Sequence, residues 1–294
     1  MYLDHWSLER NPFEAQPDSR TLFATDQHAR ALAAISYAVC EGGEPVLLRG
    51  PAGCGKTLLL RALRRQLPRE HYHVAFVPEV ACAQVGLLRR VAYHMAHTLV
   101  PDAASAMDTI LHQAGEAEAA GQPLVLMLDD WPAGASANML EELRWLLNLE
   151  PEGCRVCVLL AGEDVRPRKN WPEWLLQRLF TTMQLRPLDP EEVGPYLTHR
   201  LSVAAAASGK ERSQDGIFAP EAVEMIADWS QGVPRLINRL AHLALHVAYV
   251  DLAKHVGADP VRRAIQRLEP WRAEQTGVAA STPRHGESVG AARS

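Results

Sequence analysis

Short runs of apolar residues alternate with amphipathic stretches along the first two thirds of the chain. The apolar runs cover residues 44–50, 73–79, 123–130, 154–162 and 181–188. The stretches between them, such as KTLLLRALRRQL from Lys56 onward, repeat apolar residues at helical spacing. Apolar strands that alternate with helices are typical of a parallel sheet covered on both faces. The pattern therefore predicts an α/β fold in which helices sandwich a parallel sheet.

The alternation ends near residue 187, and only helical patterns follow. Three helices are announced by Asp189-Pro190, Ala219-Pro220 and Asp259-Pro260, since proline is favoured in the first turn of a helix. We predict an α/β domain over residues 1–187 and a small all-helical lid domain over residues 188–270. Residues 271–294 are small and polar without periodicity, so we expect a disordered tail there.

Composition describes an ordinary globular protein. The 294 residues are 47% hydrophobic and 22% charged, and the formal net charge of -5 gives no general reason to expect nucleic-acid binding. No apolar run approaches the roughly 20 residues that a membrane-spanning helix needs. The opening MYLDHWSLERNPF has no apolar stretch of the secretory kind. We therefore expect a cytoplasmic protein without a membrane span.

Two of the five cysteines, Cys154 and Cys157, form a CxxC pair that could indicate zinc or redox chemistry. No second CxxC or histidine pair accompanies it to complete four ligands. The pair also falls in an apolar run that predicts a strand, where residues three apart face opposite sides. We interpret both as core cysteines of a reduced protein.

A phosphate-binding motif follows the first predicted strand. The segment GPAGCGKT fits G-x-x-x-x-G-K-[ST] and opens a helix, the context in which this pattern is specific. Its glycines allow backbone N–H groups to turn inward around an anion, and the helix adds its positive dipole end. Lys56 would reach the β- and γ-phosphates, and Thr57 would bind Mg²⁺. The predicted nucleotide-binding residues are Gly50, Pro51, Ala52, Gly53, Cys54, Gly55, Lys56 and Thr57.

A second motif supplies acids at the end of another predicted strand. LVLMLDDW ends with Asp129 and Asp130 at the carboxyl edge, where open α/β sheets bind ligands. Asp129 together with Thr57 is predicted to hold Mg²⁺, as the metal-binding acid of P-loop enzymes does. Nucleotide binding is thus expected, and Asp130 raises the question of whether the nucleotide is also hydrolysed.

Three blocks in order carry a family resemblance. They are MYLDHWSLERNPFEAQPDSRTLFATDQHARALAAISYAV at the start, MLEELRWLLNLE at 139–150 and QGVPRLINRLAHLALHVAY at 231–249. Residues 1–268 resemble the ExeA-type AAA+ ATPases, also called general secretion pathway protein A. The chain is similar also to transposition-regulator ATPases of the TniB and TnsC type. The resemblance implies ATP and Mg²⁺ as ligands and assembly into a homo-oligomer.

The resemblance also implies individual roles. Arg235 in GVPR matches the lid arginine that reaches the γ-phosphate, and Arg178 in LLQRLF matches the arginine finger that acts on a neighbouring subunit's nucleotide. A guanidinium suits both roles because it is permanently charged and grips phosphate oxygens. The residues that match the segment near the adenine are Asn11, Pro12, Phe13 and His28.

Two residues depart from the family pattern. Asp130 stands where the resemblance implies a glutamate that polarises the attacking water, and it is shorter by one methylene, roughly 1.5 Å. Positional errors of about 1 Å can lower a rate on the order of 100-fold. Glu163 in LAGED stands where the family has a glutamine beside the γ-phosphate, and it could instead act as the base. We expect ATP binding with slow or partner-stimulated hydrolysis.

Relatives of the secretion type continue into a membrane anchor and a peptidoglycan-binding domain, which are absent from this sequence. We therefore expect a nucleotide-controlled oligomeric switch that recruits double-stranded DNA or a protein partner. Two alternatives remain, namely a soluble accessory ATPase of a secretion pathway and a scaffold that binds ATP without hydrolysing it. Side chains that could line a DNA channel, or form a solvated helix face, are Arg61, Arg64, Arg65, Arg89 and Arg90.

The tryptophans allow a base-stacking interpretation, but their positions favour packing. Trp145 and Trp229 fall within or near the end of amphipathic helical patterns, so we assign them to the core. Trp171 and Trp174 precede Arg178 and fit either a core or a subunit interface.

Overall fold

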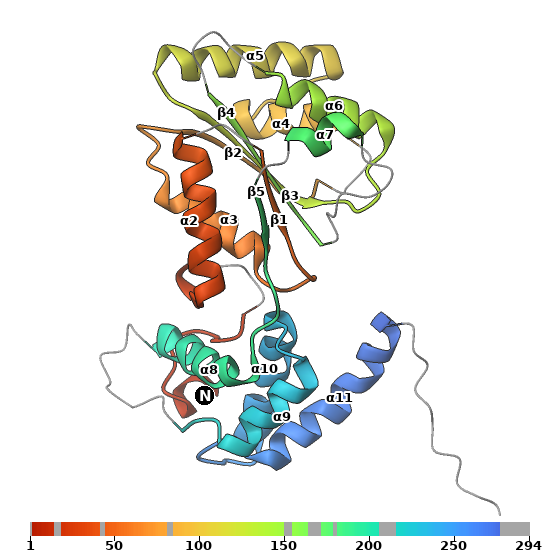
Figure 1. Cartoon of the computed structure of the whole chain (residues 1–294). Coiled ribbons are helices and arrows are strands. Elements are labelled where there is room, and N and C mark those ends of the chain that lie inside the picture. The colour runs from red at the N-terminus through yellow and green to blue at the C-terminus, as the bar shows by residue number, and fades with distance from the viewer. Residues whose placement is uncertain are drawn as a thin grey trace, which may run out of the picture.

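The computed structural model describes residues 2–14, 19–41, 45–80, 85–149, 155–163, 172–178, 181–205 and 216–276. Its described part contains a five-stranded parallel sheet in the order β2-β3-β4-β1-β5 (Figure 1). The strands are β1 (Val46–Arg49), β2 (His73–Val77), β3 (Leu124–Trp131), β4 (Val156–Gly162) and β5 (Thr181–Gln184). Each lies within or overlaps one predicted apolar run, so the α/β fold class is confirmed.

Helices cover both faces of the sheet. Side chains alternate along a strand, so Leu47 of β1 joins one hydrophobic cluster while Val46 and Leu48 join the other. The first cluster packs beneath α4 (Leu87–Ala96), α5 (Ala103–Ala119) and α6 (Ala137–Leu147). The second packs beneath α2 (Asp26–Glu41) and α3 (Lys56–Gln66). In Figure 1 these two groups of helices lie on opposite sides of the twisted sheet.

A separate group of helices follows the sheet and forms the lower part of Figure 1. It consists of α8 (Pro190–Ala205), α9 (Pro220–Ser230), α10 (Pro234–Val250) and α11 (Ala258–Thr276), and it has its own hydrophobic core. α8 and α9 begin at the predicted prolines, and Pro260 lies in the first turn of α11. Helix α11 extends to Thr276, and the rest of the expected tail lies outside the described residues.

The beginning of the chain packs against this helical group. Trp6, Leu8 and Phe13 are buried in its core, next to α1 (Tyr2–His5). Two side-chain bonds hold the segment in place, from Arg10 to the carbonyl of Val203 (3.0 Å) and between His5 Nε2 and the carbonyl of Ala253 (2.8 Å). The chain thus starts on the lid, passes the short 3-10 helix η1 (Ser19–Thr21) and then enters the α/β part. The sequence pattern groups these residues with the α/β domain, because their irregular apolar spacing does not indicate what they pack against.

Two further observations concern predictions on membranes and cysteines. Among the described residues, no helix combines the length and the apolar character needed to cross a membrane. Cys157 is buried in β4, and burial raises the pKa of its thiol to about 12. A thiol with so high a pKa stays protonated, and the thiolate is the form that binds metals. Cys154 lies outside the described residues.

Candidate functional site

The P-loop, residues Gly50–Thr57, connects the carboxyl end of β1 to the first turn of α3. Gly53 and Gly55 have φ angles of 83° and 94°, in the left-handed region that a residue with a Cβ rarely adopts. Gly55 is also the N-cap residue of α3, so the loop delivers its backbone N–H groups directly to the positive end of that helix. Such a geometry favours anion binding.

The third glycine, Gly50, is required by close packing. A Cβ on Gly50 would lie 2.6 Å from the carbonyl oxygen of Leu185, the residue that follows β5. The backbone N–H of Leu185 in turn donates to the carbonyl of Arg49 over 2.8 Å. The segment that leads out of the sheet toward the lid therefore runs directly against the start of the P-loop.

Lys56 is the cation of the site. Its Nζ donates hydrogen bonds to the carbonyl oxygens of Gly50 (2.7 Å) and Pro51 (3.1 Å). Burial lowers the pKa of Lys56, and neighbouring negative groups oppose that effect. These groups include the carboxylates of Asp129, Asp130 and Glu163, so the structure brings all three predicted acids into the electrostatic surroundings of this ammonium.

Thr57 and Asp129 meet at the floor of the site. Asp129 is only 4% exposed at the carboxyl end of β3, and burial raises its pKa. A hydrogen bond from the Thr57 side chain favours the carboxylate and opposes this rise. A hydroxyl and a buried carboxylate form the oxygen donor set that Mg²⁺ prefers, so these residues fit the metal that the sequence predicts.

Asp130 has an unusual backbone. Its φ angle is 56°, within a register shift of the β3–β4 pairing between Leu128 and Trp131, and its side chain is exposed. Aspartate and asparagine enter the left-handed region several-fold more readily than other non-glycine residues. The structure therefore gives a conformational reason for aspartate at this position, in addition to the shorter reach expected from the sequence.

Glu163 directly follows β4, the strand that pairs with β1. It is exposed, and its negative charge acts on both Lys56 and Cys54. Its electrostatic effect on both groups places its charge near the P-loop.

Arg235 approaches the same loop from the lid. Its backbone N–H, in the first turn of α10, donates to the carbonyl of Gly53 over 3.3 Å. Burial raises the pKa of the Cys54 thiol to about 11, and the positive charges of Lys56 and Arg235 oppose this rise. The guanidinium of Arg235 therefore lies within electrostatic range of the loop, on an exposed residue.

The residues expected near the adenine occupy two places. Phe13 is buried in the lid core, where its ring meets that of Phe218 edge-on with centroids 6.0 Å apart. The backbone around it is fixed by Asn11 Oδ1, which accepts from the N–H of Phe13 (3.0 Å), and by Arg200, which donates to the carbonyl of Pro12 (2.7 Å). His28 lies instead beneath the P-loop in the first turn of α2.

Arg178 is the last residue of α7 (Glu173–Arg178). Its guanidinium donates a hydrogen bond of 2.8 Å to the carbonyl of Leu147, at the end of α6. Trp174, one turn earlier, is half-buried beneath the guanidinium of Arg144, 5.6 Å from the ring centroid. Within one chain Arg178 thus serves as a helix-end contact. Trp171 lies outside the described residues.

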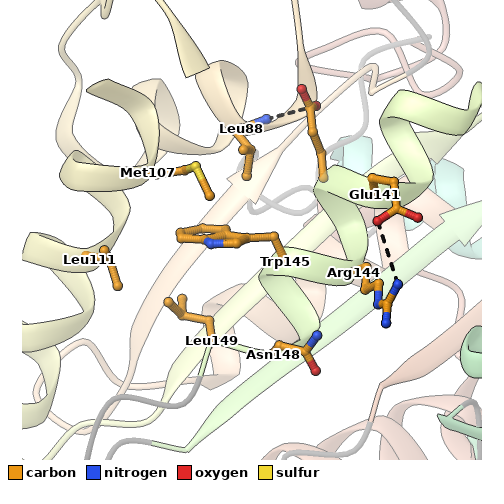
Figure 2. Close-up of a pocket in the computed structure, with 9 residues that line it drawn as sticks. Leu88, Met107, Leu111, Glu141, Arg144, Trp145, Asn148 and Leu149 are labelled. Carbon is orange, nitrogen blue, oxygen red and sulfur yellow. Dashed lines mark hydrogen bonds and ion pairs between the residues drawn. The ribbon is translucent and has the colours of Figure 1, made fainter. Parts of the chain in front are cut away.

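A hollow lies on the face of the sheet opposite to α2 and α3. It has a volume of about 630 Å³ and opens between α4, α5 and α6. Figure 2 shows the indole of Trp145 reaching between Leu88, Met107 and Leu149, with the ion pair of Glu141 and Arg144 at one side. Trp145 therefore lies at the margin of the core, whereas Trp229 is buried as predicted. The hollow shares no residue with the P-loop.

Most of the predicted basic side chains contact other parts of the same chain. Arg61 and Arg64 lie over the ring of Phe76, at 5.9 and 6.0 Å from its centroid. Arg89 donates to the carbonyl of Val100, and Arg90 to that of Pro78. A further basic residue of this group is Arg65, on the same helix as Arg61 and Arg64.

Comparison with known proteins gives two sequence matches. The AAA domain family matches residues 40–168. General secretion pathway protein A of Aeromonas hydrophila is 30% identical over 255 residues, which are 85% of this chain and 45% of that protein. These two matches support an ExeA-type AAA+ ATPase. The chain spans less than half the length of that curated relative.

Solved structures agree with the AAA+ fold. Cdc6p from Pyrobaculum aerophilum superposes with a TM-score of 0.62 at 16% identity, covering 87% of this chain and 70% of its own. Aeropyrum pernix Orc1, solved in complex with DNA, gives 0.60 at 16% identity over 92% and 71%. The Thermotoga maritima RuvB branch migration motor gives 0.52 at 18% identity over 88% and 84%. At such identities the likeness shows the fold alone.

Some residues that shape this AAA+ site were not found from the sequence. Leu185 falls in the apolar run 181–188, which predicts a strand. No sequence pattern indicates that its backbone lies close to Gly50. Thr25 lies directly before α2 and contacts the ring of His28, with 2.8 Å between Oγ1 and Nδ1. Its spacing of three residues from a histidine at a helix start was a usable signal, since an N-cap threonine faces the residue at that spacing.

Proposed function

We propose that this protein binds Mg²⁺-ATP at the P-loop and works as a nucleotide-controlled switch with slow hydrolysis. The observation that carries the proposal is the hydrogen bond from Thr57 to the buried carboxylate of Asp129, next to the two left-handed glycines of the P-loop. It brings together two separate motifs at one edge of the sheet. The choice of adenine over another base comes from the family resemblance, because a P-loop contacts only the phosphates.

The protein's own groups divide the binding task. The N–H groups of the P-loop and the ammonium of Lys56 would hold the phosphates, after Lys56 leaves the carbonyls of Gly50 and Pro51. Thr57 and Asp129 would hold the metal, which when bound neutralises charge on the β- and γ-phosphate oxygens. Because burial raises the pKa of Asp129, the cation also favours the ionised carboxylate.

The acids above the cradle support slow chemistry. Asp130 would orient the attacking water, but its side chain is one methylene shorter than glutamate and extends from a left-handed backbone. Glu163 brings a second negative charge toward the place of the γ-phosphate, where charge repulsion would raise the barrier. Acceleration would follow when a partner reorients one of these carboxylates.

The link between loop and lid supports the switch. Arg235 touches Gly53 through its backbone and would reach the γ-phosphate through its guanidinium, so ATP would fix the lid at one angle. In a homo-oligomer, Arg178 of one subunit would complete the site of the next. Nucleotide binding and assembly would then be thermodynamically linked.

We consider two kinds of partner. The DNA in the solved complex of Aeropyrum pernix Orc1 supports double-stranded DNA, through a fold that the two proteins share. A protein of a secretion pathway is the second candidate, favoured by the 30% identity to general secretion pathway protein A. The resemblance to transposition regulators of the TniB and TnsC type belongs with the first candidate.

The test is phosphate release from Mg²⁺-ATP by the purified chain, with and without duplex DNA, beside the variants Lys56→Ala and Asp130→Glu. We expect weak turnover that DNA or a partner stimulates and that Lys56→Ala abolishes. Fast turnover by the isolated chain would overturn slow hydrolysis. Tight ATP binding without turnover under any condition would make the protein an ATP-binding scaffold instead.

A further inference from the structure

We infer that His28 is a positioning residue of the P-loop, which holds the carbonyl of Cys54 outward so that the following N–H groups face the phosphates. The inference rests on the proposed function and adds a residue to it. Cys54 lies between the two left-handed glycines, at the centre of the loop. His28 belongs to α2, a different element, so this contact fixes the loop from outside.

A loop that binds an anion through its N–H groups must direct its carbonyls elsewhere, because each buried carbonyl needs a donor. The carbonyl of Pro51 accepts from the N–H of Cys54 (3.3 Å) and that of Gly53 from Arg235 (3.3 Å). The carbonyl of Gly55 accepts from the N–H of Leu59 in α3 (2.9 Å).

The carbonyl of Cys54 depends on a side chain. It accepts a hydrogen bond from the ring of His28, and Cys54 itself is 1% exposed, so water offers little replacement. An unpaired buried carbonyl is unfavourable, because it loses its bonds to water without gaining a donor in the protein. Without His28, the peptide between Cys54 and Gly55 would rotate to find another donor, and the N–H of Gly55 would leave the cradle.

The carbonyl of Cys54 only accepts, so it requires the hydrogen on the ring nitrogen that faces it, and the hydroxyl of Thr25 can donate to the other nitrogen. The ring of His28 is 5% exposed, with Nδ1 2.8 Å from Thr25 Oγ1 and with Nε2 3.7 Å from the place that a Cβ on Gly55 would occupy. Nε2 therefore faces the P-loop and donates to Cys54, which leaves Nδ1 as the acceptor of the Thr25 hydroxyl. Burial lowers the pKa of His28 and so favours this neutral ring, although the bond to Cys54 and the charge of Glu192 oppose it.

Substitutions at His28 separate donation from packing. In His28→Gln the side-chain amide nitrogen stands near the place of Nε2, so the bond to Cys54 can be kept. In His28→Phe the ring remains but its donor is lost. Thr25→Val removes the hydroxyl at constant shape, whereas Thr25→Ser keeps it. His73→Gln is the matched control, because His73 is a half-buried histidine on β2 that is not part of the P-loop.

The experiment measures the affinity for Mg²⁺-ATP by calorimetry in the full chain, with thermal unfolding of each variant alongside. We expect His28→Phe to weaken binding roughly tenfold or more, and His28→Gln to stay within about threefold of the native chain. Thr25→Val is expected to weaken binding in the native background, where the hydroxyl orients the ring, but not in His28→Gln, which has no ring for Thr25 to orient. His73→Gln should bind as the native chain does.

A spectroscopic measurement checks the geometry independently of ATP. Proton–nitrogen correlation spectra of the imidazole should report hydrogen on Nε2 of His28 in the native chain and a changed Nδ1 shift in Thr25→Val, where the hydroxyl that donates to Nδ1 is lost. Hydrogen on Nδ1 in the native chain would overturn the inference. So would native affinity in a folded His28→Phe, while loss of binding in Lys56→Ala would still support the proposed function. A native chain that binds no ATP would overturn both.

Discussion

The backbone N–H of Arg235 donates a hydrogen bond to the carbonyl of Gly53 over 3.3 Å and so joins the first turn of α10 to the P-loop. Val233 adds a packing contact at the same point, because its Cγ1 lies 3.2 Å from where a Cβ on Gly53 would be. On the other side of the loop, Leu185 touches Gly50 as the chain leaves the sheet. The P-loop therefore lies between the segment that follows β5 and the first turn of α10.

We predict that Gly53→Ala weakens Mg²⁺-ATP binding and lowers stability. Its φ angle of 83° strains any residue with a Cβ, and that atom would lie 2.7 Å from the Cβ of Arg235. Strain of this kind costs about 1–3 kcal/mol. Gly121→Ala is the control, since Gly121 has a φ angle of 67° with nothing within 4 Å. Equal losses of stability in urea unfolding, with ATP affinity intact in both, would contradict a role for the lid contact.

The pairing of Thr57 with Asp129 predicts a specific dependence on the metal. Thr57→Val removes the hydroxyl that bonds to the carboxylate, whereas Thr57→Ser retains it. We expect Thr57→Val to need roughly 10- to 100-fold more Mg²⁺ for half-maximal ATP binding, the range for loss of a charged hydrogen bond and a ligand. Titration of Mg²⁺ at fixed ATP measures this. An unchanged midpoint in Thr57→Val would show that the hydroxyl takes no part in metal binding.

The left-handed backbone at Asp130 predicts a conflict between rate and stability. Asp130→Glu should turn over ATP faster, but glutamate adopts a φ angle of 56° less readily, so we expect a loss of about 0.5–1 kcal/mol in urea unfolding. Asp130→Asn should keep the stability and lose most of the turnover. Asp108→Glu, on the exposed face of α5, is the control and should not lower stability, because glutamate favours helices. Full stability in Asp130→Glu would argue against backbone strain.

Partly or fully buried histidines predict a loss of stability in mild acid. Burial lowers the pKa of His242 below its ordinary 6.5, and the same holds for His28, His73, His94 and His199. Between each lowered pKa and 6.5 the unfolded chain binds more protons than the folded chain, so the free energy of unfolding falls as the pH drops through this window. Asp129 has the opposite effect, at lower pH. Its raised pKa adds stability that is complete below pH 3.8 and is lost as the pH rises through the pKa of the folded chain.

Urea unfolding at about pH 7.5 and about pH 5.5 measures this dependence. His242→Gln should reduce the difference between the two values, because Nδ1 of His242 is buried without a hydrogen-bond partner in the described residues and its ring carries no compensating bond there. A variant with the native pH dependence would show that His242 does not contribute.

Local patterns were enough to predict most of the fold and part of the site. The strands, the P-loop and the helix-start prolines follow from spacing and residue type within a few positions, which is why β1, α3 and α8 lie where expected. Contacts between distant segments carry no such signal. The burial of Phe13 in the lid core and the approach of Leu185 to Gly50 depend on how separate elements pack, and that is settled by the whole chain.

His28 illustrates the same limit. Resemblance placed it near the adenine, but its hydrogen bond to Cys54 depends on the approach of α2 to the P-loop. The left-handed φ angle of Asp130 likewise arises from the shifted register between β3 and β4, which no local pattern encodes. Residue type gives the chemistry of such positions, whereas their orientation follows from packing.

Arg178 offers a test of assembly that one chain alone cannot provide. Within the chain its guanidinium holds the carbonyl of Leu147 at the end of α6, so Arg178→Ala could lower activity simply by loosening that helix end. A mixing experiment separates this from action on a neighbouring subunit. Lys56→Ala removes the lysine of the P-loop but keeps Arg178. Arg178→Ala keeps the P-loop and removes the arginine. Each variant alone should be inactive.

In an equimolar mixture, a heterologous interface would pair an intact P-loop with an intact Arg178 at roughly a quarter of the sites, so about that share of native turnover should return. Recovery should increase with protein concentration, because it requires association. Arg178→Lys is a useful companion, since lysine keeps the charge but not the planar fork that grips phosphate. If the mixture stays inactive at concentrations where native subunits associate, Arg178 serves its own chain, and its contact with Leu147 is the whole of its role.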